Sequence, residues 1–243
     1  MRTLIRALSI IFLAALPVMA PAQDLTEDRV KELVLEAIRE NPEIVFEAAM
    51  LMRQREEEAR QASQATVLER NREALLNDPN APVLGNPNGD VTVVEFFDYN
   101  CPYCRRVKPS VEALLERDKN VRLVYREWPI LGEGSVFAAR AALASREQGK
   151  YEEFHWAMMG MQGRAEEASV LRIAQQVGLD LSRLRRDMES EEIDEHIATS
   201  ARLTGELGIS GTPGFVIGDN IVAGVIEADQ MIRIVEETRI SSR

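Results

Sequence analysis

The sequence predicts an α/β fold for the larger, C-terminal part of the chain, preceded by a helical region of different composition. Residues 91–97 (VTVVEFF) and 121–126 (VRLVYR) are strongly β-prone, and a helical segment that starts at the two cysteines separates them. A long helical stretch follows, and a β-hairpin and a helix end the chain. The expected order is therefore β-α-β, a helical insertion of about 80 residues, and β-β-α.

Residues 1–22 have the pattern of a secretory signal peptide. Arg2 and Arg6 precede an apolar run at 7–18, and the small residues 20–22 (APA) form a typical cleavage site. The run is too short and wrongly flanked for a transmembrane helix, and no stop-transfer pattern follows. These features disfavour the alternative of a retained membrane anchor. We expect an exported, periplasmic chain that begins near Gln23 and has no membrane span.

The charge of the chain argues against two classes of partner. Removal of residues 1–22 would take away two arginines and no acidic residue, which changes the formal net charge from −11 to −13. Nucleic acids and anionic lipid surfaces reward clusters of lysine and arginine, so neither is an expected partner.

Residues 23–77 are expected to form a helical oligomerisation region and a linker arm. One amphipathic helix is predicted at about 26–40, and Asn41 and Pro42 start a second helix that extends to about 77. The first part of the second helix is apolar on one side, whereas residues 53–66 contain no apolar residue larger than alanine. We expect self-association through residues 30–52, with 53–66 as the arm. The alternative is a solvated helix that lies on the main domain.

Residues 78–243 are expected to form the main domain. The segment 77–90, with three prolines and two glycines, is a loop that marks the boundary, and Val83 and Leu84 suggest a short edge strand within it. After the second strand, helices are predicted at about 135–147, 151–161, 166–177, 191–207 and 228–238, and hairpin strands at 215–217 and 221–223.

The two cysteines of the chain, Cys101 and Cys104, have the spacing of a redox-active pair. A disulfide between them would close a very short loop and add little stability. At the start of a helix, unpaired N–H groups and the positive end of the helix dipole favour the thiolate of Cys101, and Pro102 suits the first helical position. Cys101 is therefore the expected nucleophile, and Cys104 the thiol that resolves a mixed disulfide. The pair carries two electrons itself, so no cofactor is expected.

The segment 96–104 (FFDYNCPYC), with Pro109 after it, resembles the active-site segment of thioredoxin-fold proteins. Together with the helical insertion at about 132–208 and the segment 211–215 (GTPGF), it resembles the DsbA-like thiol-disulfide oxidoreductase family. The resemblance implies a cis peptide bond before Pro213 and a Thr212-Pro213 loop that faces the cysteines and binds substrate. It also implies a buried acid, Glu95, which exchanges protons with Cys104; exposure of Glu95 to solvent is the alternative.

The helical region ahead of this domain resembles that of the suppressor-of-copper-sensitivity protein C group (ScsC-like). That resemblance implies a homotrimer that acts as a disulfide isomerase on unfolded or misoxidised exported proteins and is reset by a membrane redox partner. Tyr103 stands where the best-known DsbA oxidases have histidine, and Thr212 where they have valine. Both differences favour an isomerase or reductase over the alternative, an oxidase that donates disulfides.

Metal binding is the main competing interpretation of the cysteines. Two thiolates suit Cu(I), so Cys101 and Cys104 are a possible copper site in the reduced protein. A closed zinc site needs four ligands, and only His155 and His196 remain, both in distant helices. We expect His155 to be half packed in its helix and His196 to lie on the surface.

A chaperone or scaffold without redox chemistry is a third class of function. Met158, Met159 and Met161 could line a flexible groove for unfolded clients, but core packing is the commoner role of such a cluster.

Overall fold

The computed structural model describes residues 26–241, so the expected signal peptide at 1–22 lies outside the described part. The chain divides into two compact units, one up to Glu57 and one from Glu58 onward. Within residues 26–241, every helix is too short or too polar to cross a membrane.

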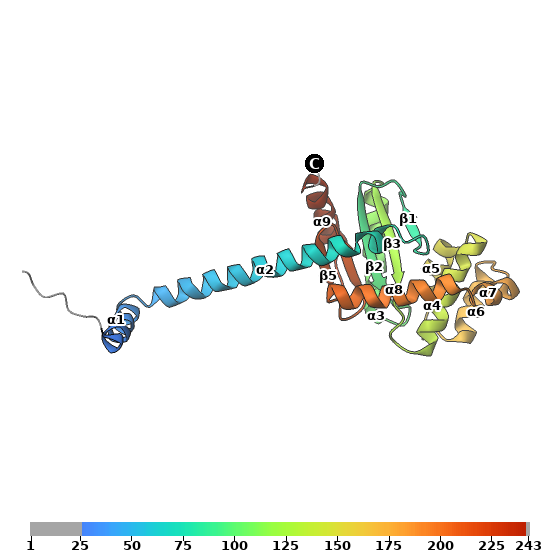
Figure 1. Cartoon of the computed structure of the whole chain (residues 1–243). Helices are drawn as coiled ribbons and strands as arrows, with labels where there is room; N and C mark the ends of the chain where they lie inside the picture. Colours follow the sequence, from blue (N-terminus) through green and yellow to red (C-terminus); the bar gives the residue numbers. More distant parts are fainter. Residues whose placement is uncertain (1–25, 242–243) are drawn as a thin grey trace, which may run out of the picture. The chain divides into compact units, whose positions relative to one another are not determined.

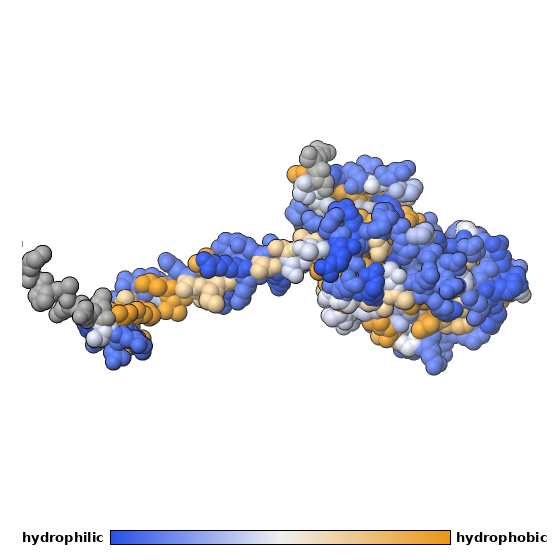
Figure 2. Space-filling model, in the orientation of Figure 1, coloured by the Kyte–Doolittle hydropathy of each residue, from blue (hydrophilic) through white to orange (hydrophobic). Residues whose placement is uncertain are grey.

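The first unit contains α1 (Glu27–Glu40) and the beginning of α2 (Glu43–Leu76). Thr26 caps α1 by accepting a hydrogen bond from the N–H of Arg29 at 3.3 Å, and Glu27 and Asp28 suit the positive end of the helix dipole. No residue of α1 is buried. Figure 2 shows the resulting apolar surface, in orange, on this unit. The exposed large apolar residues of the two helices here are Val30, Leu33, Val34, Leu35, Ile44, Val45, Phe46, Met50, Leu51 and Met52.

The second unit is built on a mixed sheet in the order β1-β3-β2-β4-β5 (Figure 1). Its strands are β1 (Val83–Gly85), β2 (Val91–Phe97), β3 (Val121–Glu127), β4 (Gly214–Ile217) and β5 (Asn220–Ala223). The central pair, β2 and β3, is parallel, and α3 (Pro102–Arg117) connects its strands. The other pairs are antiparallel. This is the β-α-β and β-β-α order that the sequence predicts.

The helical insertion lies between β3 and β4. It contains α4 (Glu133–Ser145), the 3-10 helix η1 (Arg146–Gln148), α5 (Tyr151–Gly160), α6 (Glu167–Gln176), α7 (Leu181–Asp187) and α8 (Glu191–Leu207), and α9 (Ala228–Ser241) follows β5. The sequence did not predict α7. This helix has seven residues and buries only Leu184, so its sequence contains no repeated apolar spacing from which a helix could be predicted.

Both faces of the sheet are covered. The face that carries Val93 and Phe97 packs against α3, α9 and the insertion, and the face that carries Val94 and Phe96 packs against α8 and the C-terminal part of α2. Leu75 of α2 is 2% exposed in that second cluster. The predicted domain started at residue 78, whereas the compact unit starts at Glu58 because residues 58–76 contribute to its core.

Candidate active site

The junction between β2 and α3 places Cys101 at the start of a helix. Cys101 is the N-cap of α3, with extended backbone angles (φ −77°, ψ 118°), and Pro102 occupies the first turn. The N–H of Cys101 donates to the carbonyl oxygen of Asp98 at 3.0 Å, which fixes the turn between strand and helix. The first N–H groups of a helix have no partner within it, so they are free to hydrogen-bond the sulfur.

The surroundings of Cys101 favour its thiolate form over its thiol form. Its pKa is lowered to about 6, firstly because the Cys104 thiol donates a hydrogen bond to it. The Thr212 side chain and the backbone N–H groups of Cys104 and Tyr103 add to the effect, while burial opposes it. The thiol form instead can donate to the carbonyl oxygen of Thr212, which lies 3.2 Å from Sγ. The helix start thus acts in the direction expected from the sequence, and the Cys104 thiol contributes more.

Cys104 lies one helical turn farther along α3, and its pKa is shifted in the opposite direction to that of Cys101. Its side chain is fully buried. Burial raises its pKa strongly, and the hydrogen bond to Cys101 and the negative charges of Glu95 and Cys101 raise it further. Both cysteines are free thiols in this structure. At neutral pH the site therefore holds one thiolate and one thiol.

Glu95 is buried rather than exposed. It is 1% exposed and lies on β2 between Val93 and Phe97, on the face that packs against α3 and Cys104. Solvent exposure by strand alternation is ruled out because both faces of β2 are covered. Burial, followed by the charge of Cys101, raises the pKa of Glu95 to about 8. Its Oε1 has no hydrogen-bond partner among residues 26–241.

The Thr212-Pro213 peptide bond is cis, and it precedes β4, the strand next to β2. Because the Thr212 carbonyl contacts Cys101 Sγ, this loop does face the cysteines. The structure thus brings Thr212 and Pro213 together with Cys101, Cys104 and Glu95. The Tyr103 side chain is 58% exposed at the same helix start.

Three residues near the cysteines make hydrogen bonds that fix the site, and the sequence did not predict these hydrogen bonds. Asp98 and Asn100 hydrogen-bond loops of the insertion through their side chains. The Arg105 side chain donates to the carbonyl oxygens of Tyr99, Met161 and Gly163. The sequence signal for these contacts is weak because, apart from Tyr99, the partners lie 32 to 65 positions away.

The predicted positions of both histidines are wrong. His155 is fully buried, burial lowers its pKa to about 3, and its Nδ1 lies 3.0 Å from the Tyr99 hydroxyl. His196 is 1% exposed, and its Nε2 lies 2.9 Å from Glu127 Oε2. Burial of these rings depends on partners in other elements, which helix periodicity does not reveal. Met158 and Met159 are core residues, as expected.

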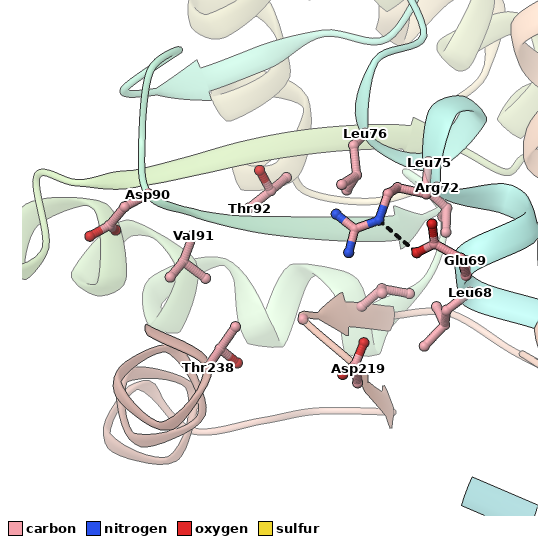
Figure 3. A pocket seen from close by; sticks show the side chains of 12 residues that line it. Leu68, Glu69, Arg72, Leu75, Leu76, Asp90, Val91, Thr92, Asp219 and Thr238 are labelled. Carbon is pink, nitrogen blue, oxygen red and sulfur yellow. Dashed lines mark hydrogen bonds and ion pairs between the residues drawn. The ribbon is translucent and has the colours of Figure 1, made fainter. Parts of the chain in front are cut away.

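A pocket of about 190 Å³ lies away from the cysteines (Figure 3). Asp90, Val91 and Thr92, at the beginning of β2, line one side, whereas the cysteines follow the end of that strand. Leu68 and Leu75 of α2 line another side. Among residues 26–241, no three histidine, cysteine, aspartate or glutamate side chains gather as a metal site would require.

The thiolate of Cys101 should control the reactivity of the protein. We expect the rate of alkylation by iodoacetamide to rise with pH and to reach half of its maximum near pH 6, because only the thiolate reacts. The Cys101→Ser variant, which retains Cys104, should be nearly inert up to pH 9. A half-maximum near pH 8.5, as for an ordinary cysteine, would contradict this assignment.

The burial of Glu95 should make stability depend on pH. Its pKa in the folded chain, about 8, exceeds the ordinary value of 4.5, so the unfolded state releases its proton first as pH rises. Stability is then lost between these two values, by at most about 1.4 kcal/mol per pH unit. Glu95→Gln cannot ionise, so its unfolding free energy relative to wild type should rise across this window. Urea unfolding followed by tryptophan fluorescence measures it; a difference that does not change with pH would exclude a buried acid.

Comparisons with known proteins agree with this geometry. Residues 92–236 match the model of the DSBA-like thioredoxin domain. A solved thioredoxin-like oxidoreductase from Silicibacter pomeroyi DSS-3 is 64% identical, with a TM-score of 0.69 over 70% of this chain and 98% of that chain. A linker-deletion mutant of Proteus mirabilis ScsC is 28% identical, with a TM-score of 0.69 over 93% of this chain and 100% of that chain.

The match to curated relatives is partial. The Na(+)/H(+) antiporter NhaA 3 of Salinispora tropica is 35% identical over 137 residues, which are 56% of this chain and 21% of the antiporter. The chain thus spans about a fifth of the length of this antiporter and of NhaA 1 of Salinispora arenicola, another curated relative. The family match covers more than half of the chain and contains both cysteines and the cis proline. The chain therefore belongs to the family of DsbA-like thioredoxin domains, as its active-site segment suggested.

Proposed function

We propose that the chain is a thiol-disulfide oxidoreductase that acts on cysteines of other proteins. One observation carries the proposal: two thiols in one site have pKa values shifted in opposite directions, Cys101 downward and Cys104 upward. Thiol-disulfide exchange needs this combination, because a thiolate attacks and a second thiol must wait until the mixed disulfide has formed.

The reaction follows from the positions of these groups. The Cys101 thiolate attacks one sulfur of a client disulfide, the client S–S bond breaks, and the other client sulfur leaves as a thiolate. Cys104 then loses its proton and attacks Cys101 Sγ, which releases the second client sulfur and leaves a Cys101-Cys104 disulfide. Glu95 is the proposed acceptor of the Cys104 proton, and Thr212 and Pro213 are the proposed contact for the client strand.

Substitution of each cysteine separates the two steps. Cys101→Ala should lower reduction of insulin by dithiothreitol to the uncatalysed rate, because no nucleophile remains. Cys104→Ala should accumulate a mixed disulfide with insulin, visible on a non-reducing gel. Catalysis by Cys101→Ala above the uncatalysed rate would refute the proposed function.

We infer further that the protein is an exported disulfide isomerase or reductase rather than an oxidase. The support is the pattern of residues 1–22 and the replacement, at Tyr103 and Thr212, of the residues found in the best-known DsbA oxidases. Its clients would then be misoxidised exported proteins, and a membrane redox partner would keep the cysteines reduced.

Self-association is the second part of this inference. Apolar side chains of the first unit, such as Leu33, Val45 and Phe46, are 40–67% exposed in the single chain. Exposed apolar surface of this extent is typical of protein interfaces. We propose that these residues join three copies of the chain, so that several thiol pairs can act on one client.

Negative charges introduced into this apolar surface should dissociate the oligomer into monomers. The variant Leu33→Glu with Val45→Glu should sediment as a monomer and lose most scrambled-ribonuclease isomerisation, while insulin reduction changes less than twofold. Ser63→Glu, an added charge at an exposed position of the polar part of α2, should leave both unchanged. A monomeric variant with full isomerase activity would contradict a role for self-association.

A further inference from the structure

The strand β1 forms one edge of the sheet, and one of its residues is free to pair with another chain. Among residues 26–241, β1 has a neighbouring strand, β3, on one side only (Figure 1). The carbonyl oxygen of Pro82 accepts from the N–H of Tyr125 at 3.0 Å, and farther along the N–H of Asn86 donates to the carbonyl oxygen of Val121 at 2.9 Å. Because backbone groups alternate between the two sides of a strand, Val83 turns its N–H and C=O away from β3. An open edge of this kind is a template for a further extended segment.

A groove runs along this edge. Its first part, of about 640 Å³, lies between residues 82–84 and the α5 side chains of Tyr151, Glu152 and Trp156. Its second part, of about 480 Å³, continues past the end of β1 to the C-terminal part of α3. Glu152 and Trp156 line both parts, so the two meet at these side chains. Volumes of roughly 300–1,000 Å³ are typical of sites that bind ligands.

The groove contains apolar surface beside the free backbone groups. Val83 is 37% exposed, and Trp156 is half-buried. The Trp156 ring packs edge-on against the His155 ring, with 4.8 Å between their centroids, and the Lys108 Nζ lies 5.3 Å from the Trp156 centroid. These contacts hold the indole in place, and tryptophan is one of the residues that most often anchor a protein interface.

The charge of the groove is mainly negative. Lys119 and Arg146, the basic residues that line it, donate hydrogen bonds to backbone carbonyl oxygens of the chain itself. Within residues 26–241, neither Glu116 nor Glu152 forms an ion pair, and both side chains are exposed. Their charge is therefore available to a basic group from outside. The acidic residues that line the groove are Glu112, Glu116, Asp118, Glu152 and Glu153.

We propose that the edge of β1 and this groove bind an extended segment of a partner protein, in which an apolar residue is flanked by lysine or arginine. The segment adds a strand beside β1, and its backbone pairs with the N–H and C=O of Val83. Its apolar side chain packs on Trp156, and its basic side chains lie near Glu116 and Glu152. A second copy of this chain is the less favourable occupant, because pairing two β1 edges would bring identical acidic side chains together.

The groove is separate from the thiol site. Glu116 lies in the last turn of α3, whereas Cys101 is the N-cap of that helix. At about 1.5 Å per residue, these two positions are roughly 22 Å apart along the helix. A partner held in the groove leaves both cysteines accessible. The inference therefore goes beyond the proposed function and does not depend on it.

The test uses the full-length protein and a fluorescein-labelled peptide, TKTLTKT, whose leucine and two lysines lie on one face of a strand. Fluorescence anisotropy should show saturable binding of one peptide per chain. Glu116→Gln with Glu152→Gln should raise the Kd about tenfold at low salt and less at high salt, because exposed charges are screened. Glu236→Gln with Glu237→Gln, the same change of charge at two exposed residues of α9, is the matched control and should leave the Kd unchanged.

The backbone pairing is tested from both sides. Val83→Pro removes the outward N–H without removing a hydrogen bond to β3, and it should raise the Kd about fivefold. Because proline can also alter β1 itself, a second measurement uses the unmodified protein. The same peptide with N-methyl groups on its three central amides has no donors there, and it should bind at least tenfold more weakly.

The outcomes separate this site from other interpretations. Absence of saturable binding to the wild type would overturn the inference, and so would equal binding of the methylated peptide or equal effects of the two glutamine pairs. Protein with both cysteines alkylated should bind the peptide with an unchanged Kd; loss of binding would place the peptide at the thiol site and contradict the inference. If Val83→Pro altered sedimentation of the protein instead of the Kd, β1 would pair with a second copy of the chain, and the inference about a partner would be wrong.

Discussion

The site depends on one constraint: a strand buried on both faces ends where a helix begins. Because β2 is covered by α3 on one side and by α2 and α8 on the other, its end has one well-defined position. Cys101 follows as the N-cap of α3, so the backbone N–H groups of Tyr103 and Cys104 help to lower the pKa of its thiol. The same helix turns Cys104 into the core, and the same strand places Glu95 on the α3 face. Three groups of different acidity are thus positioned by two elements.

The sequence was sufficient where a local pattern carries the information. The strand 91–97 and the helix 191–207 have the predicted ends. Each hairpin strand begins one residue earlier than predicted and ends where predicted. Glu95 was ambiguous because alternation along a strand does not show whether both faces are covered. His196 was misplaced because its burial depends on Asp78 and Glu127, which no local pattern connects to it. The sequence could identify the thiols, but the contacts of Asp98 with residues 130–131 require the folded chain.

Exposed apolar side chains occur in two groups that have different physical origins. In the first unit, residues such as Val45 and Phe46 lie on a helix and are not buried by any element within residues 26–57, which is typical of a surface for association. In the second unit, Ile130 and Leu131 are held outward by hydrogen bonds to a buried carboxylate. A helical pattern can be recognised in a sequence, whereas a surface maintained by backbone hydrogen bonds cannot. This difference explains why the sequence indicated self-association but did not reveal the exposure of Ile130 and Leu131.

In the proposed exchange reaction, the charge of Cys101 differs between the two steps. Burial raises the pKa of both Glu95 and Cys104, and the charge of the Cys101 thiolate raises both pKa values further. When Cys101 enters a mixed disulfide, that charge disappears, and so does the hydrogen bond that Cys104 donated to it. The part of the raised pKa of Glu95 that comes from this charge then disappears, and the Cys104 thiol loses the partner that held its proton. Attack therefore removes one of the causes that hold the proton on Cys104, while burial of Cys104 remains.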